Sequence, residues 1–161
     1  MILLSDTNVL IDLGHVGGIK ILGQLGAVEV LDVVLLECKH PSQPDLVKDI
    51  VDAGISQIQT DVAWVKAAAR YRKGNLSVPD ALNIFYAKTF GCTLLTNEKP
   101  MRLVCQQELI IVHGTLWIIE AAYQQCLVPN EELCQWLLIL SKLDRRLPVL
   151  EIANLRQKLG C

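Results

Sequence analysis

Short apolar runs alternate with helical patterns along the whole chain, and this alternation restricts the fold more than any other feature. The run at residues 2–5 is followed by a helical pattern over 8–16, and the run at 92–96 by another over 100–107. Strands and helices that alternate in this way form parallel β-α-β units with right-handed crossovers. The sequence therefore predicts an α/β fold, a three-layer α/β/α sandwich around a central, mostly parallel sheet of about five strands.

Glycine, proline and capping residues delimit the expected elements. Ser77 and Asp61 each stand at a predicted helix N-terminus, and Gly54 follows a predicted C-terminus. Strands are expected at 2–5, 28–31, 55–60, 92–96 and 109–113. Helices are expected at 8–16, 19–26, 33–39, 45–54, 62–74, 75–91, 100–107, 115–127, 131–146 and 149–160. We expect a single domain over residues 1–161, with a helical C-terminal extension from about residue 115.

Composition narrows the possible classes of protein. The chain has 161 residues, of which 52% are hydrophobic, and this suits one domain with a real core. Its formal net charge is -2, so any contact with nucleic acid must use a local basic patch. Charged residues interrupt every long apolar stretch, and no basic region precedes the first one. We therefore expect neither a membrane span nor a signal peptide, and a location in the cytoplasm.

The cysteines favour a reduced protein. None of the six forms a CxxC pair, and most lie within apolar patterns, which is typical of buried, reduced thiols. The three histidines show no ligand spacing with them, so a zinc site is not expected.

Four acidic residues lie at or just beyond the ends of apolar runs. Asp6 and Glu98 follow predicted strands, Glu37 lies one short turn beyond another, and Asp80 opens the helix before the run at 92–96. In parallel sheets, functional groups gather beyond the carboxyl ends of the strands. Carboxylates brought together there repel one another unless a cation binds. Ligation by oxygen alone favours Mg²⁺ or Mn²⁺.

Each acid also has a purely structural interpretation. Asp6 can cap the first helix, and Asp80 can complete a capping box with Ser77. Glu98 can interact with a helix dipole, and Glu37 can be a solvated surface residue. The metal-site hypothesis is favoured because all four acids are predicted at one edge of the sheet.

Several motifs together resemble the PIN-domain nucleases, in particular their VapC-like toxin branch. "SDTNVLIDL" is similar to the opening of that family, and Glu37 matches its glutamate after the second strand. Asp80 and Ala81 match an Asp-Ala pair, and residues 96–98 stand at its Thr-x-Asp motif. "VHGTLWIIEAAYQQCLV" resembles a helix that begins with Gly-Thr. The resemblance covers most of the chain, and the order and spacing of the motifs carry it.

The resemblance implies metal-dependent hydrolysis of RNA phosphodiester bonds. Asp6, Glu37, Asp80 and Glu98 would be the catalytic and metal-binding residues, with Mg²⁺ or Mn²⁺ as cofactor. Glu98 departs from the family, which usually has aspartate there, and its extra methylene makes the carboxylate's placement less fixed. Asn8, Thr96 and Asn97 would support the ligands by hydrogen bonds. We read Asp12 as a surface or capping residue.

Basic residues near these acids are the candidates for substrate binding. Lys39, Lys99 and Arg102 flank the proposed ligands, and Arg70 belongs to the basic stretch "KAAARYRKGN". Such side chains neutralise phosphates, although a basic helix end is also commonly just solvated.

The size and the single domain resemble the toxin of a toxin–antitoxin pair. Such a toxin would have RNA as its substrate and a small antitoxin protein over the acidic cleft, and a second copy of the chain is a further candidate partner. The alternative is a non-catalytic PIN-fold module that binds RNA or protein. A phosphate-handling hydrolase with an aspartyl nucleophile fits less well, because such an enzyme requires a second aspartate at the position where this chain has Asn8.

Overall fold

A computed structural model describes residues 1–143 and 147–161 of the chain. Its strands are β1 Ile2–Ser5, β2 Ala27–Leu31, β3 Ser56–Ile58, β4 Thr93–Leu95 and β5 Val112–His113. Its α-helices are α1 Thr7–Val16, α2 Ile19–Leu25, α3 Asp32–Glu37, α4 Leu46–Asp52, α5 Val62–Ala68, α6 Val78–Phe90, α7 Lys99–Gln107, α8 Thr115–Gln124, α9 Asn130–Lys142 and α10 Val149–Leu159, and a 3₁₀ turn, η1, spans Ala69–Tyr71.

The five strands form one parallel sheet in the order β3-β2-β1-β4-β5. The chain builds outward from β1 on one side, then returns to the other side of β1 to add β4. The order of strands therefore reverses between β1 and β4, and ligands of open α/β sheets bind at such a point. Ser5 pairs with Leu95, so the next residues of both strands emerge side by side at the carboxyl edge.

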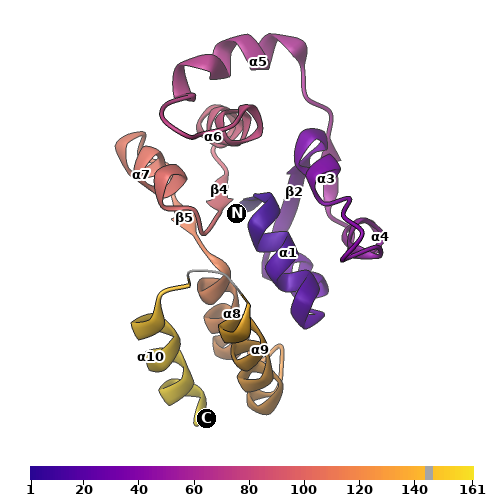
Figure 1. Ribbon diagram of the computed structural model, residues 1–161, viewed down its shortest axis with the longest axis vertical. Helices are drawn as coiled ribbons and strands as arrows, with labels where there is room; N and C mark the ends of the chain where they lie inside the picture. Colours follow the sequence, from indigo (N-terminus) through magenta and orange to yellow (C-terminus); the bar gives the residue numbers. More distant parts are fainter. Residues whose placement is uncertain (144–146) are drawn as a thin grey trace.

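Helices cover both faces of the sheet, which confirms the predicted three-layer α/β sandwich (Figure 1). Helix α6 contacts α5, α7 and β4, whereas α1 contacts α2, α4, α8 and α9. The central strands are accordingly apolar on both faces, because Leu3 and Leu4 of β1 and Leu94 and Leu95 of β4 are fully buried. This packed centre fixes the strand ends that carry the candidate site.

Most expected elements are shorter than their sequence patterns suggested, among them a helix and a strand that lose about half of their predicted length or more. The helix predicted over 62–74 ends at Ala68 and tightens into η1, so the basic residues that follow are not on a long helix. The strand predicted over 109–113 keeps only its last two residues, because Leu109 has a φ of 57° and ends the turn after α7.

The last three helices lie together at one end of the molecule (Figure 1). The structure places α8 against α1 and α2, and α10 against α8 and α9. The end of the helix expected over 131–146 falls on residues 144–146, outside the described part of the chain. The division into a single domain with a helical extension from about residue 115 stays a prediction.

The cysteine prediction is wrong for two residues. Cys134 on α9 and Cys161 after α10 form a disulfide with a Cα–Cα distance of 6.0 Å. They are 27 positions apart, and only the packing of α10 against α9 brings them together. Cys38, Cys92 and Cys105 are buried free thiols, as expected, and Cys126 is free but exposed.

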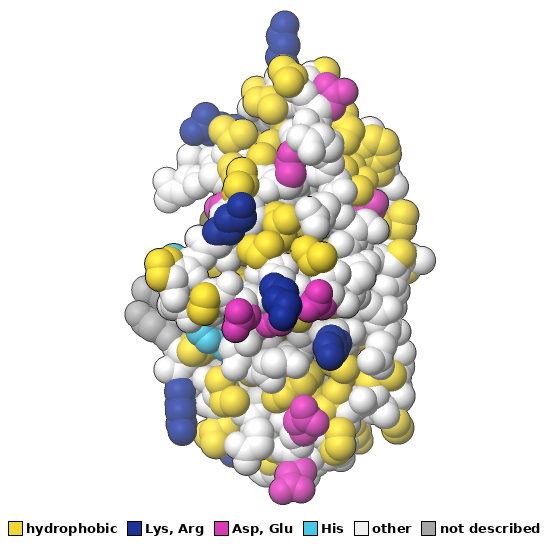
Figure 2. All heavy atoms as spheres, turned by 90° about the vertical axis from the view of Figure 1, so that its right-hand side faces the viewer, with side chains coloured by type: hydrophobic (Ala, Val, Ile, Leu, Met, Phe, Trp, Pro, Cys, Tyr) yellow, Lys and Arg dark blue, Asp and Glu magenta, His cyan; other side chains and the backbone are white. Residues whose placement is uncertain are grey.

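No helix within the described residues is both long and apolar enough to cross a membrane. On the side of the molecule where α3 and α4 lie, Figure 2 shows acidic and basic side chains interspersed among hydrophobic ones. The described residues form no continuous basic band on that face, in line with the net charge of -2. The location in the cytoplasm stays a prediction.

Candidate metal centre

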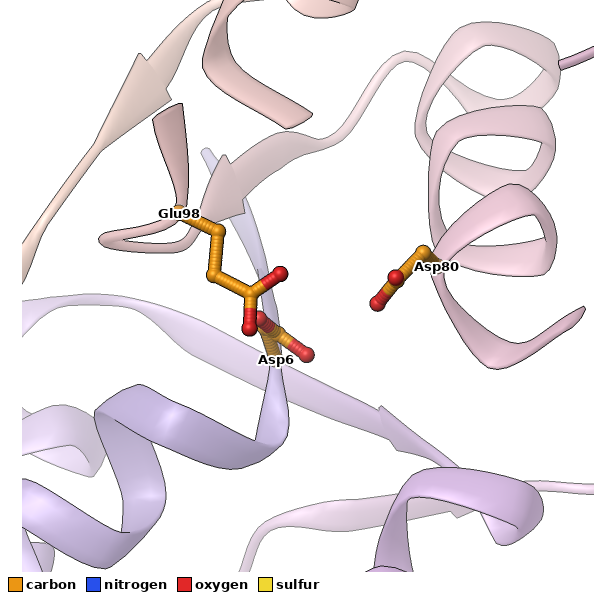
Figure 3. Close-up of side chains that lie close together, drawn as sticks. All are labelled: Asp6, Asp80 and Glu98. Atoms are coloured by element: carbon orange, nitrogen blue, oxygen red, sulfur yellow. The ribbon is translucent and has the colours of Figure 1, made fainter. Parts of the chain in front are cut away.

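Three carboxylates converge at the carboxyl edge of the sheet (Figure 3). Asp6 follows β1, Glu98 lies two residues beyond Thr96 at the end of β4, and Asp80 faces both from the first turn of α6. One oxygen from each carboxylate lies within 4.8 Å of the other two. Residues far apart in the sequence thus form one cluster at the point where the order of strands reverses.

Asp6 is the buried member of the cluster. Its Oδ1 accepts a hydrogen bond from the backbone N–H of Thr7 at 2.7 Å, so it caps α1 as well as facing the cluster. Its Oδ2 accepts a second bond from the Thr96 hydroxyl at 2.9 Å. Only 3% of the residue is exposed. The pKa of Asp6 is raised to about 7, mainly by burial; the charges of Glu98 and Asp80 add to the increase, and these two hydrogen bonds oppose it.

Asp80 also serves two purposes. Its Oδ2 accepts the backbone N–H of Ser77 at 2.8 Å, and its own N–H donates to the Ser77 hydroxyl at 3.2 Å. This reciprocal pair is a complete capping box at the N-terminus of α6. The structural interpretation and the ligand hypothesis are therefore compatible for this residue, because the cap fixes the side chain that faces Asp6.

Glu98 is held by two neighbours. The side-chain amide of Asn8, on α1, donates a hydrogen bond to its Oε1. Its backbone N–H donates to the Thr96 hydroxyl at 3.2 Å, the same hydroxyl that donates to Asp6. Asn8 thus restrains the longer glutamate side chain at this position, and Thr96 links the two acids.

Glu37 lies beside the cluster but is not one of the three grouped carboxylates. Its Oε1 accepts a hydrogen bond at 3.1 Å from the hydroxyl of Thr7, the residue that follows Asp6. Its pKa is raised, first by desolvation and then by the charges of Asp80 and Glu98. The geometry therefore groups Glu98, rather than Glu37, with Asp6 and Asp80, and a ligand role for Glu37 stays a prediction.

Asp12 is not the surface or capping residue that the sequence suggested. It is fully buried, and its Oδ2 accepts hydrogen bonds from Asn97 Nδ2 at 2.9 Å and from the Thr115 hydroxyl at 3.0 Å. Asn97 also accepts the backbone N–H of Thr115 at 2.9 Å. A Cβ at Gly114 would lie 2.5 Å from Asn97 Oδ1, so this close approach requires glycine. The network ties α1 and α8 to the residue before Glu98.

The four candidate basic residues fall into two groups. Lys99 and Arg102 stand on α7 next to the cluster, and Arg102 Nη1 donates to the backbone carbonyl of Thr96 at 3.0 Å. Arg70 lies on η1 with its guanidinium 4.6 Å from the ring centre of Tyr71, and Lys39 is exposed just beyond α3. Substrate binding by any of them stays a prediction.

The residues present fit a hard divalent cation. The clustered ligand atoms are carboxylate oxygens, and none of the three side chains forms an ion pair with a cationic side chain within the described residues. A Mg²⁺–oxygen distance of roughly 2.1 Å lets two oxygens on opposite sides of one ion lie about 4.2 Å apart. The three oxygens lie within 4.8 Å of one another, so small movements of the side chains, or a bridging water, would let Asp6, Asp80 and Glu98 hold one ion.

Asn83 was not singled out from the sequence. It lies on α6 three residues beyond Asp80 and is fully buried, and neither its side-chain oxygen nor its nitrogen has a hydrogen-bond partner among the residues that the structure describes. Buried amides in proteins are nearly always paired, often with water. The apolar residues around Asn83 in the sequence gave no indication that its amide would be buried in this way.

The family model described as a PIN domain (DUF3368) matches residues 2–160. The chain belongs to the PIN-domain family. No curated protein matches it significantly. Among solved structures, this PIN domain is similar to PAE2754 from Pyrobaculum aerophilum, with a TM-score of 0.56 and 14% identity over 75% of this chain and 89% of that one.

A second solved structure, VapBC2 from Rickettsia felis bound to a DNA fragment from its promoter, also resembles this PIN domain. The TM-score is 0.50, with 15% identity over 71% of this chain and 98% of that one. At such identities the likeness concerns the fold alone. The predicted membership of the PIN family is confirmed, and the acidic cluster lies where the fold exposes its strand ends.

Proposed function

We propose that this PIN domain is a metal-dependent endoribonuclease that hydrolyses phosphodiester bonds in RNA, using Mg²⁺ or Mn²⁺. The observation that carries the proposal is the convergence of Asp6, Asp80 and Glu98. Three acids on separate elements, one of them buried, are costly to keep together without a cation. Membership of the PIN family supports a nuclease function.

When bound, the ion would supply an activated water and neutralise charge on the phosphate. The chain contributes placement of the ligands. The Thr96 hydroxyl and the Thr7 N–H orient Asp6, Asn8 orients Glu98, and the capping box orients Asp80. Glu37 lies beside them, where its carboxylate can bind a water of the ion or a second ion. Asn97 supports the loop that carries Glu98 through its bonds to Asp12 and Thr115.

We further propose that the protein is the toxin of a toxin–antitoxin pair that acts in the cytoplasm. The similarity to the VapBC2 structure supports this context. A small antitoxin would cover the acidic cluster, and a second copy of the chain is a further candidate partner. Lys39, Lys99, Arg102 and Arg70 are the candidates for contact with RNA phosphates.

Cleavage of single-stranded RNA in Mg²⁺ tests the proposal. Asp6→Asn and Asp80→Asn should each abolish cleavage while leaving the circular dichroism spectrum unchanged. Asp61→Asn is the matched control, because Asp61 also caps a helix but lies outside the cluster, and asparagine caps as well as aspartate. If either Asp6→Asn or Asp80→Asn cleaves RNA at the wild-type rate, the proposal is refuted. RNA binding without cleavage in saturating Mn²⁺ would instead support the non-catalytic alternative.

A further inference from the structure

A pocket of about 210 Å³ opens beside the acidic cluster. Asn97, Lys99 and Arg102 form one wall, from the segment on both sides of Glu98 and the first turns of α7. His113 and Trp117 form a second wall, and Glu151, from the first turn of α10, lies on a third. We propose that this pocket holds one unpaired nucleotide of the RNA chain, next to the phosphate that is cut. This inference rests on the proposed ribonuclease function.

The aromatic wall suits a nucleobase. The rings of His113 and Trp117 are parallel, with an angle of 2° between them and centroids 4.1 Å apart. Burial and the nearby Arg102 lower the pKa of His113, so its ring is neutral near pH 7. Trp117 also lines the adjacent hollow on the α10 side. Within the described residues, no aromatic ring other than His113 covers its indole surface. Bases of single-stranded RNA stack on such rings.

The basic wall suits a phosphate. Neither Lys99 nor Arg102 forms an ion pair with a carboxylate in the described part of the chain. The Thr96 carbonyl accepts one N–H of Arg102 at 3.0 Å, which holds the guanidinium in place and leaves its other donors for a ligand. Because Lys99 directly follows Glu98, a phosphate bound here would belong to a nucleotide adjacent to the cluster.

Size and charge restrict the occupant further. Pockets for drug-sized ligands usually measure roughly 300–1,000 Å³, so this smaller pocket suits one base and not a paired stem. Glu151 disfavours a second phosphate and offers two acceptor oxygens. Guanine presents two neighbouring N–H donors on its Watson–Crick edge, whereas the other bases present one, so we infer that guanine fits best.

Binding is measured without cleavage, in EDTA, by fluorescence anisotropy of a labelled oligo(U) that carries one central guanosine. Base stacking is worth about 1–3 kcal/mol per base, so Trp117→Leu should weaken binding roughly 5- to 150-fold. Trp117→Phe should retain most of the affinity, and Tyr123→Leu, on the same helix but outside the pocket, is the control for the fold. For each of Lys99→Gln and Arg102→Gln, the slope of log affinity against log salt concentration should become less steep by about one.

Oligo(U) without the guanosine tests the base preference. The wild type should bind the guanosine-containing strand more tightly, and Glu151→Gln should remove the difference; equal affinity of the wild type for both would overturn the assignment of guanine. If Trp117→Leu binds RNA as Tyr123→Leu does, the pocket is not the nucleotide site. If Trp117→Leu binds RNA normally but no longer forms a complex with a co-encoded protein, the pocket is a binding site for that protein, and the proposal is overturned.

These outcomes are distinct from failure of the proposed function. Binding in EDTA does not depend on catalysis, whereas the cleavage test with Asp6→Asn does not involve the pocket. A Trp117→Leu variant with wild-type binding and cleavage at unchanged positions would refute the pocket and leave the ribonuclease proposal intact.

Discussion

Replacing Asp6 by asparagine should stabilise the metal-free protein while abolishing its response to metal. In the folded chain, the pKa of Asp6 is raised from 3.8 to about 7, mainly by burial. One pKa unit corresponds to about 1.36 kcal/mol, so the charged carboxylate costs the metal-free fold on the order of 4 kcal/mol above pH 7. Asn is a tolerable replacement, because its oxygen can accept the Thr7 N–H and its amide can donate to the Thr96 hydroxyl.

The pH dependence has a definite sign. Between pH 3.8 and about 7 the folded protein binds a proton at Asp6 that the unfolded chain does not, so the contribution of Asp6 to stability falls as the pH rises. Asp6→Asn removes this dependence. The free energy of unfolding of the variant should therefore exceed that of the wild type by roughly 2–3 kcal/mol more at pH 8 than at pH 5.

Urea unfolding in EDTA at the two pH values measures this difference, and repeating it in Mg²⁺ measures the metal response. The wild type should gain stability with metal by mass action, and Asp6→Asn should gain little. Asp61→Asn, an exposed cap, should match the wild type under every condition. If the gap between Asp6→Asn and the wild type is the same at pH 5 and pH 8, the buried carboxylate does not carry the assigned cost, and the reasoning is refuted.

Three further outcomes are expected. Asn8→Ala should lower Mn²⁺ affinity about 10- to 100-fold in isothermal titration calorimetry, because it releases Glu98; unchanged affinity would rule out that positioning role. Thr115→Val should destabilise the protein by about 1–3 kcal/mol in urea, since buried Asp12 and Asn97 lose a hydroxyl partner, whereas a neutral effect would contradict the network. Asn83→Leu should raise the midpoint of thermal unfolding, because it removes a buried amide that has no partner in the described part of the chain; a lower midpoint would indicate a buried water partner.

Much of the fold could be predicted because the signals are local. Apolar runs that end on Asp6 or at Thr96 marked two central strands, and the cap residues Asp61 and Ser77 marked helix starts that the structure retains. The helix after Asp61 was predicted too long, because helical propensity continues past the point where packing tightens the chain into η1.

The site could be predicted only in part. The order of motifs identified Asp6, Asp80 and Glu98, which the strand ends and α6 bring together. The pairing of Asp12 with Thr115 joins α1 to α8 across more than a hundred positions, and helical periodicity does not show which buried face meets which. The stacking of Trp117 on His113 could not be predicted either, because it depends on the turn between β5 and α8.

The double use of Asp6 and Asp80 as helix caps has a consequence for how the protein opens. Each cap orients its carboxylate using only neighbouring backbone, so the ligands on the α1 and α6 segments can be set before those segments dock. An ion bound afterwards would act as a cross-link between segments that otherwise separate independently. Metal should therefore slow amide hydrogen exchange at the first turns of α1, α6 and α7 together, turning three local openings into one cooperative event.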